Sequence, residues 1–266
     1  MARLACIDLP AFPLQLLLRR HPEWRDHPAA VVEEDKPLAR ILWINERARR
    51  FEILPGMRYA AGLALASNLC AGVVPESEIA DGVAFVTKRL RRFSPDIEPA
   101  PQEPGVFWVD ASGLDFLDPS IEAWGQKIFD DLREHDFAGR IAVGFDRFGT
   151  YALARSCRGP RVVVLKSPEA EQAWTKKVRL DRLHLEPQAR DTLDALGIKT
   201  VGDLVRLPAG SLLARYGQEI LGLHQSARRL RIVPLEPQPA EESLRQELWF
   251  DFSERDVGRL LFGIKG

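Results

Sequence analysis

Two aspartates end short apolar segments of the chain, and their carboxylates are the groups best suited to bind a metal ion. Asp8 ends the segment Leu4–Asp8 and Asp110 ends the segment Val106–Asp110; both segments are typical of buried strands. If these strands are neighbours in one sheet, we expect both carboxylates at one edge, where oxygen ligands can hold Mg²⁺ beside a phosphate. An aspartate after a strand also commonly caps the next turn or helix, and this alternative stays open.

The segment 193–204 is typical of two helices joined by a tight turn. Gly197 permits a left-handed turn between the helices, and Thr200 can cap the second one. Such a hairpin can direct backbone N–H groups and a helix N-terminus at a phosphate. The same pattern fits an ordinary pair of packed helices equally well.

Cysteine and histidine chemistry finds little support in the sequence. The three cysteines lie far apart without a C-x-x-C motif, so neither a disulfide framework nor a structural zinc site is predicted. The five histidines show no i, i+4 pair for a metal. Cys157 lies near Arg155 and Arg158, but we interpret its thiol as a buried helix residue and not as a nucleophile.

The hydrophobic pattern predicts strands and helices in alternation up to about residue 167, around one mixed sheet. Beyond about residue 170 it predicts helices alone, then an extended linker at 234–239 and a new strand at 248–252. The predicted strands are 4–8, 29–32, 40–44, 106–110, 140–145 and 161–165. The predicted helices are 14–20, 46–51, 60–69, 76–90, 119–134, 150–156, 188–196, 200–206, 209–216 and 218–230.

Composition limits the classes of protein that remain. The chain has 266 residues, with 37 basic and 38 acidic side chains and a formal net charge of −1. Because these charges nearly cancel, contacts with nucleic acid must come from local patches. No run of about 18 apolar residues is present to span a bilayer, and the opening segment lacks the pattern of a signal peptide. We therefore expect a globular cytoplasmic protein without a membrane partner.

Motifs along most of the sequence resemble those of the Y-family, or translesion, DNA polymerases. The segment 207–230 and the linker after it resemble in particular the ImuB-type branch, the non-catalytic homologues found in bacterial inducible mutagenesis cassettes. The motifs are IDLPAF (7–12), ARRFEILPGM (48–57), RRFSPDIE (91–98), WVDASGLD (108–115), AVGFDRFGTYALARS (142–156) and LGIKTVGDL (196–204).

This resemblance implies an α+β, multidomain fold. We expect a palm of mixed sheet and helices at 1–20 and 76–167, and small fingers at 21–75. An all-helical thumb with a helix-hairpin-helix is expected at 168–236, and 237–266 would form a linker and the truncated start of a little finger. The stretch 246–250 faintly resembles clamp-binding peptides, but its alternating apolar residues favour the first strand of that little finger.

The acidic residues depart from the family's pattern. Active members hold two Mg²⁺ ions with three acidic residues, of which Asp8 and Asp110 match two. Ala111 stands where the third, a glutamate, is expected. Losing a carboxylate from such a site weakens metal binding and slows phosphoryl transfer by orders of magnitude.

The phosphate-binding motifs depart as well. Arg49 matches the arginine of the fingers' triphosphate clamp, but Glu46 replaces its tyrosine and repels a triphosphate. The palm's Asn-Lys pair reads Phe-Gly at 148–149. The thumb's first Gly-x-Gly hairpin reads His-Leu-Glu at 184–186, which opposes binding of a phosphate.

These departures predict a scaffold and not an enzyme, acting in DNA-damage-induced (SOS) mutagenic translesion synthesis. No cofactor would be required, and Asp8 and Asp110 would hold only residual Mg²⁺; Arg49 would be a vestige of nucleotide binding. The protein partners that the resemblance implies are an error-prone C-family polymerase, the RecA-like ImuA and the β sliding clamp, bound mainly through regions absent from this chain. Weak, non-specific DNA binding is assigned to Gly197, Lys199, Thr200, Gly202, Arg228 and Arg229, with Arg231 beside them.

Two alternatives stay open. The first is a slow translesion polymerase that uses Asp8 and Asp110 with a third ligand from Asp115 or Asp146. The second is a duplex-binding module without replication partners. Primer extension and capture of a clamp or polymerase subunit separate these possibilities from the scaffold.

Overall fold

A five-stranded sheet lies at the centre of the computed structural model, which describes residues 3–113, 119–230 and 233–239. The strand order is β5–β6–β1–β7–β8. These strands are β1 (Leu4–Asp8), β5 (Ile97–Pro99), β6 (Val106–Asp110), β7 (Arg140–Gly144) and β8 (Arg161–Val164). β1 runs antiparallel to β6 and β7, β5 antiparallel to β6, and β7 parallel to β8, so the sheet is mixed.

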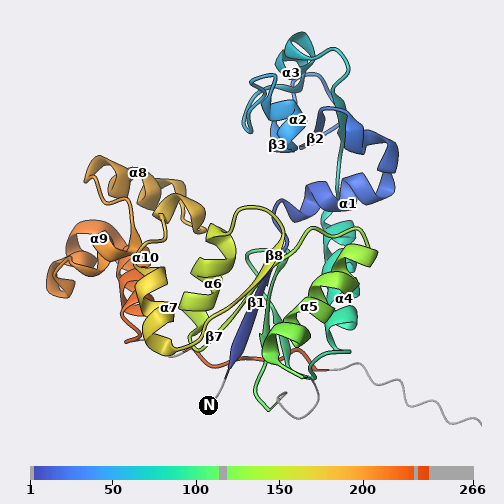
Figure 1. Ribbon diagram of the computed structural model, residues 1–266. Coiled ribbons are helices and arrows are strands. Elements are labelled where there is room, and N and C mark those ends of the chain that lie inside the picture. Colours follow the sequence, from blue (N-terminus) through green and yellow to red (C-terminus); the bar gives the residue numbers. More distant parts are fainter. Residues whose placement is uncertain (1–2, 114–118, 231–232, 240–266) are drawn as a thin grey trace, which may run out of the picture.

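Helices cover both faces of this sheet (Figure 1). Because side chains alternate along a strand, Ala5 and Ile7 lie on one face of β1 and Cys6 and Asp8 on the other. The first face packs against α4 (Glu76–Leu90) and α5 (Ile121–Glu134), with Trp124 among its buried side chains. The second face packs against α6 (Arg147–Ser156). The register of β1 therefore places Asp8 under α6.

A separate three-stranded sheet is built between α1 (Phe12–Arg20) and α4. Its order is β3–β2–β4, with β2 antiparallel to β3 and parallel to β4. This unit stands at one end of the molecule, beyond α1 (Figure 1). Its elements are β2 (Ala29–Val32), β3 (Ile41–Ile44), β4 (Cys70–Gly72), α2 (Glu46–Arg49), α3 (Tyr59–Leu65) and a 3₁₀ turn, Pro22–Asp26.

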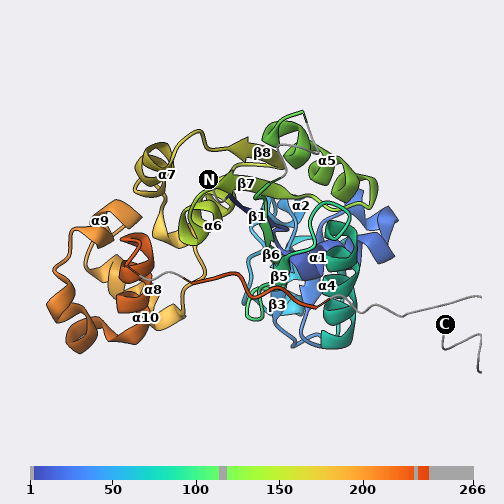
Figure 2. The same ribbon diagram turned by 90° about the horizontal axis from the view of Figure 1, so that it is seen from below.

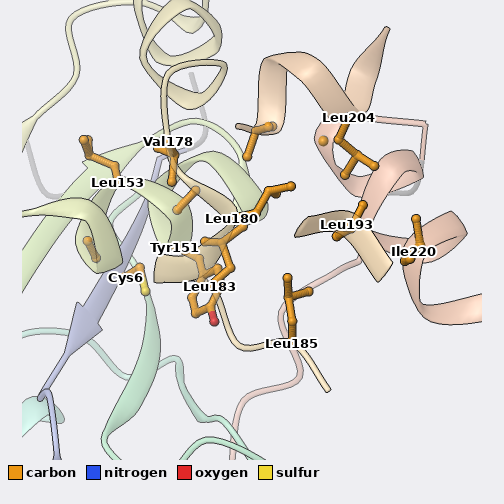
Figure 3. Packing of buried hydrophobic residues seen from close by; sticks show 14 of the residues in the cluster. Cys6, Tyr151, Leu153, Val178, Leu180, Leu183, Leu185, Leu193, Leu204 and Ile220 are labelled. Atoms are coloured by element: carbon orange, nitrogen blue, oxygen red, sulfur yellow. The ribbon is translucent and has the colours of Figure 1, made fainter. Parts of the chain in front are cut away.

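The remaining helices form a third group beside α6. They are α7 (Pro168–Thr175), α8 (Pro187–Ala195), α9 (Val201–Val205) and α10 (Leu212–Ala227), and α10 is kinked at Gly217. Figure 3 shows side chains such as Leu180, Leu193 and Ile220 gathered in one apolar cluster that continues to Tyr151 and Cys6. The helical group is thereby joined to the central sheet through a continuous core.

The segment 233–239 is extended and runs back along the edge of the central sheet (Figure 2). The amide of Gln238 donates to the carbonyl of Ile97 at 2.8 Å, and the amide of Glu236 donates to the Glu98 carboxylate at 2.7 Å. Nη2 of Arg91 donates to the carbonyls of Gln238 and Pro239. These bonds cover part of the open edge of β5.

The predicted mixed α+β class is confirmed, and most predicted elements are present to within a few residues. The expectation of one sheet is wrong, because strands β2, β3 and β4 form a sheet of their own. The pattern missed three short elements: β4, β5 and α7. The helix predicted at 60–69 is shorter, because it ends at Leu65 and β4 follows. The division into palm, fingers, thumb and little finger stays a prediction. The predicted strand at 248–252 and the stretch 246–250 lie outside the described residues, as do Asp115 and Arg231.

Within the described ranges, no helix has the length and apolar character needed to cross a membrane.

Candidate active-site cleft

A cleft of about 610 Å³ opens where the end of β1, the β3 side of the smaller sheet and the segment 181–184 approach one another. Trp43 of β3 lines it and is 42% exposed. Its other lining residues are rich in positive charge, because Arg49, Arg140, Arg155 and Arg182 all border it. The structure thus brings four arginines to one concave surface of a chain that is nearly neutral as a whole.

Asp8 lies beside this cleft, at the end of β1. Its side chain is only 1% exposed, and both carboxylate oxygens are engaged. Nη1 of Arg155 lies 3.1 Å from Oδ1, and Nη1 of Arg140 lies 3.3 Å from Oδ2. A buried carboxylate requires such partners, because an isolated charge would be costly away from water.

The fold fixes both arginines for this role. Arg140 is directly opposite Asp8 in the β1–β7 register. Arg155 lies in the last turn of α6, on the sheet face that carries Cys6 and Asp8. Burial acts to lower the pKa of the Arg155 guanidinium, but Asp8, Tyr151 and Glu103 together outweigh it and the net pKa is raised. Arg155 therefore stays charged.

Glu103 is a second carboxylate of the cleft, and sequence reasoning missed it. Both of its oxygens lie 2.9 Å from the hydroxyl of Tyr151, and Nη2 of Arg155 lies 3.9 Å from Oε2. Burial and the Glu103 charge raise the pKa of Tyr151 far above its ordinary value, so the phenol remains a donor. The loop 100–105 is rich in proline and shows no strand pattern, but Glu103 is the only acidic residue between Glu98 and Asp110.

The expected meeting of Asp8 and Asp110 is wrong. Because β1 and β6 are antiparallel, Asp110 pairs with Leu4, and Asp8 pairs with Val106. Four residues of strand separate the two carboxylates, which corresponds to about 13 Å. Oδ1 of Asp110 accepts the amide of Ser112 at 2.8 Å, which is the turn-capping arrangement that had remained open.

Three further positions at which the resemblance or its alternative placed a ligand or a phosphate contact also lie at the Asp110 end of the sheet. They are Ala111, Asp146 and the pair at 148–149. Ala111 is buried and follows β6, so its identity does not affect the charge near Asp8. Asp146 caps α6 by accepting the amide of Gly149 at 2.9 Å, and it follows Gly144, which pairs with Leu4. A third ligand from Asp146 is therefore not available to Asp8. The pair at 148–149 begins α6, at the opposite end from Arg155.

The described residues do not fit a centre for two divalent cations. In the part of the chain that the structure describes, no group of three or more histidine, cysteine, aspartate or glutamate side chains is placed to hold a metal ion. Two guanidinium groups already neutralise Asp8, and Glu103 already accepts a hydrogen bond from the Tyr151 hydroxyl. Mg²⁺ requires several oxygen ligands with room for water, and this arrangement does not offer them.

The predicted nucleotide and hairpin residues are placed as follows. Arg49 borders the cleft, is exposed and lies 3.7 Å from the Glu46 carboxylate. Gly197 has a φ of 69°, the left-handed turn that the sequence predicts between α8 and α9. Thr200 caps α9 in a reciprocal arrangement with Asp203. Lys199 and Arg228 are exposed, so both remain candidates for DNA contacts.

Two of the predicted DNA contacts have structural roles instead. The Arg229 guanidinium is paired with the buried Glu171 and lies 3.9 Å from Asp146, which joins the end of α10 to α7 and to the start of α6. Gly202 faces the chain itself, because a Cβ there would lie 2.8 Å from the Lys176 carbonyl oxygen. The amide of Gly202 donates to that same carbonyl at 2.9 Å and is therefore not available to a phosphate, whereas a contact of Arg229 with DNA stays a prediction.

Residues 7–147, more than half of the chain, match the impB/mucB/samB family. The chain belongs to this family. The match begins at the end of β1, beside Asp8, and continues to Arg147 at the start of α6. It includes Glu103 and Arg140 of the cleft.

Curated relatives extend the comparison beyond the matched region. DNA polymerase IV of Halorhodospira halophila is 24% identical over 260 residues, which cover 96% of this chain and 71% of the relative. DNA polymerase IV of Legionella pneumophila, strain Corby, is 25% identical over 248 residues, covering 91% and 68%. These similarities therefore include the helical group α7–α10.

Solved structures show the same fold at low identity. DinB from Sulfolobus solfataricus superposes with a TM-score of 0.71 at 16% identity, covering 88% of this chain and 69% of that one. An insertion ternary complex of Dbh DNA polymerase gives a TM-score of 0.70 over the same shares, also at 16% identity. The fold of this chain is that of a Y-family DNA polymerase.

The prediction that the protein is not an enzyme is contradicted by these comparisons, because its relatives are DNA polymerases. That prediction rested on the departures at Ala111, Glu46, 148–149 and 184–186. The structure places Ala111 and the pair at 148–149 away from Asp8, so these two were weak grounds for it.

Proposed function

We propose that this protein is a template-directed DNA polymerase that acts in translesion synthesis. The observation that carries the proposal is the cleft beside Asp8, formed within a Y-family polymerase fold and bordered by arginines and an exposed tryptophan. Arginine side chains suit the phosphates of a nucleotide or primer, and Trp43 offers a flat apolar surface to a base. Relatives named DNA polymerase IV support the same activity.

We propose that Asp8 and Glu103 are the carboxylates that take part in nucleotide addition. Asp8 and Asp110 were the pair expected from the sequence, but only Asp8 lies beside this cleft, behind Arg140 and Arg155, and Glu103 is the carboxylate that shares Arg155 with it. Because both carboxylates are already neutralised, we expect slow nucleotide addition. Lys199 and Arg228 are proposed to contact the duplex backbone by charge, with the salt dependence that such contacts have.

Primer extension tests this proposal. The full chain is incubated with a labelled primer on an undamaged template and on one with an abasic site, in Mg²⁺ and in Mn²⁺. We expect single-nucleotide addition, lowered by about a hundredfold or more in Asp8→Asn. Asp110→Asn is the matched control, an identical change at the other end of the sheet, and should leave addition unchanged. No addition by the unmodified chain would contradict the proposal, and equal loss in both variants would contradict the role of Asp8.

We also propose that the protein works with an error-prone C-family polymerase, ImuA and the β sliding clamp. The resemblance of 207–230 to the ImuB-type branch supports these partners. Capture of each purified partner by the tagged chain tests, one partner at a time, whether segment 207–230 contributes to these contacts. Failure to retain any of the three would contradict that contribution without affecting the result of primer extension.

A further inference from the structure

Fixed positive charges surround Asp8 where a metal-dependent site would have unpaired carboxylates. The two guanidinium groups lie 3.1 and 3.3 Å from its two oxygens. The third charged neighbour, Glu103, is bound to Tyr151 and lies 3.9 Å from Arg155. The negative charge that would attract a divalent cation is thus already balanced by side chains of the protein.

The same guanidinium groups retain capacity for a further partner. Nε of Arg140 is buried and has no hydrogen-bond partner within the described ranges of the chain. The side chains of Arg140 and Arg155 are 21% and 26% exposed, and both border the cleft. A guanidinium has five N–H donors. Nε of Arg155 already donates to the Arg182 carbonyl at 3.2 Å, so the donors left for a phosphate are chiefly those of Arg140.

The charges of the cleft agree with the lack of a cation site. Arg49 and Arg182 add two positive charges to those of Arg140 and Arg155, and the acidic residues near the four arginines are Asp8, Glu46, Glu103 and Asp181. Four positive and four negative charges leave the cleft without the excess of carboxylates that attracts Mg²⁺, and its guanidinium groups can still donate to a phosphate.

We propose that Arg140 and Arg155 take the place of divalent cations beside Asp8, so that the cleft binds the phosphates of a nucleoside triphosphate without a metal. This inference rests on the proposed function, which supplies the nucleotide as the class of ligand. It goes beyond that function because it assigns the counter-charge for the triphosphate to two residues of this chain. Arginine pairs bind phosphate oxygens through several parallel N–H donors and need no bridging ion.

Calorimetric titration of the full chain with dATP, in EDTA and in Mg²⁺, tests the inference. We expect the two dissociation constants to agree within about threefold. Inorganic triphosphate should compete with dATP in EDTA, because the phosphates carry the recognition, and deoxyadenosine should not. Binding that requires Mg²⁺, or competition by deoxyadenosine alone, would overturn the inference.

Asp8→Asn should change the affinity for dATP in opposite directions in a metal-dependent site and in the arginine site proposed here. In a metal-dependent site the substitution removes a ligand and weakens binding. Here it removes a negative charge about 3 Å from two guanidinium groups, so the affinity for dATP in EDTA should rise by about tenfold. A lower affinity in Asp8→Asn would overturn the inference.

Arg140→Gln provides the complementary variant, since Arg155 still pairs with Asp8. Its affinity for dATP in EDTA should fall by about tenfold or more. Arg206→Gln, at an exposed arginine outside the cleft, is the control and should bind as the unmodified chain does. Unchanged affinity in Arg140→Gln, with thermal unfolding showing a folded variant, would overturn the inference.

Failure of the inference can be told from failure of the proposed function. Primer extension together with strictly Mg²⁺-dependent dATP binding would leave the function standing and overturn the inference. Tight dATP binding in EDTA without any primer extension would support the inference and contradict the proposed function.

Discussion

The hydroxyl of Tyr151 lies 2.9 Å from both carboxylate oxygens of Glu103. The same hydroxyl oxygen accepts the amide of His184 at 3.1 Å. One phenol therefore links the loop before β6 with the segment that leads into α8. We expect Tyr151→Phe to lower the free energy of unfolding by about 1–2 kcal/mol, because an amide and a carboxylate lose a buried partner. Urea unfolding measures this change. Tyr216→Phe, at another partly buried tyrosine, is the control; an equal loss there would contradict the assignment.

Glu171 gives a prediction for the dependence of stability on pH. Its side chain is fully buried between α7, the start of α6 and Arg229, and burial raises its pKa above the ordinary value of 4.5. The folded chain therefore binds this proton more tightly than the unfolded chain does. Stability from this group is present below pH 4.5 and is lost as the pH rises through the raised value. Relative to Glu171→Gln, the unmodified chain should become less stable over that window in guanidinium unfolding.

Glu169 is the control for this prediction, because it lies on the same helix and has a shift of opposite sign. A hydrogen bond from Ser167 lowers its pKa, so its contribution is present above pH 4.5 and is lost as the pH falls. Parallel pH profiles for Glu169→Gln and Glu171→Gln would contradict the assigned causes.

Gly105 gives a prediction about the backbone near Asp8. Its φ is 97°, and an added Cβ would lie 2.6 Å from Cβ of Phe12 and 2.8 Å from the Leu9 carbonyl oxygen. Gly105→Ala should destabilise the chain by about 3 kcal/mol or more, through backbone strain and overpacking together. Gly113 has a φ of 75° with no atom near its Cβ position, so Gly113→Ala should cost only about 1 kcal/mol. Thermal unfolding of both variants measures the difference, and equal losses would show that packing at Gly105 is unimportant.

The thiols of Cys6 and Cys157 should be poor nucleophiles. Burial raises the pKa of both, and for Cys157 this outweighs the opposite effect of Arg161 and Arg140. We expect iodoacetamide at pH 8 to modify Cys157 more slowly than free cysteine, and Cys6 only after unfolding. Mass spectrometry of the alkylated chain checks this, with the urea-unfolded chain as control. Rapid alkylation of Cys157 in the folded chain would indicate an activated thiol.

Arg91 is expected to hold the extended segment 233–239 against the sheet. Removing its guanidinium in Arg91→Ala eliminates the bonds to the carbonyls of Gln238 and Pro239. Hydrogen exchange at the amides of Glu236 and Gln238 should then become faster, because opening of the segment costs less free energy. Arg92→Ala is the control, since Arg92 pairs with Asp131 and does not contact the segment. Unchanged hydrogen exchange in Arg91→Ala would show that the hydrogen bonds to Ile97 and Glu98 are enough to hold the segment against the sheet.

The sequence predicts the elements of this fold better than the relations between them. Long apolar patterns such as 76–90 give the helices directly, whereas β5 has only three residues and contains Pro99, so it shows no strand pattern. Strand direction is the larger gap. Alternation identifies the faces of β1 and β6 but does not tell whether they run parallel, and that difference separates Asp8 from Asp110.

The side chains around Asp8 show the same limit of prediction from the sequence. Asp8 could be recognised because it ends an apolar strand, but its partners lie 132 and 147 residues away in the chain. Arg140 and Arg155 look like ordinary charged residues at the ends of a strand and a helix. Only the register of β1 with β7 and the packing of α6 bring them to one carboxylate.

The ion pair between Arg20 and Glu78, 2.6 Å long, joins the end of α1 to the start of α4. The chain therefore departs for the smaller sheet and returns from it at nearly the same place, as in a domain inserted into a host. Changes in the length of loops beyond this junction leave the strand pairing of the larger sheet untouched. The wall of the cleft that carries Trp43 and the strand that ends at Asp8 accordingly belong to different sheets, so an insertion in the first need not alter the second.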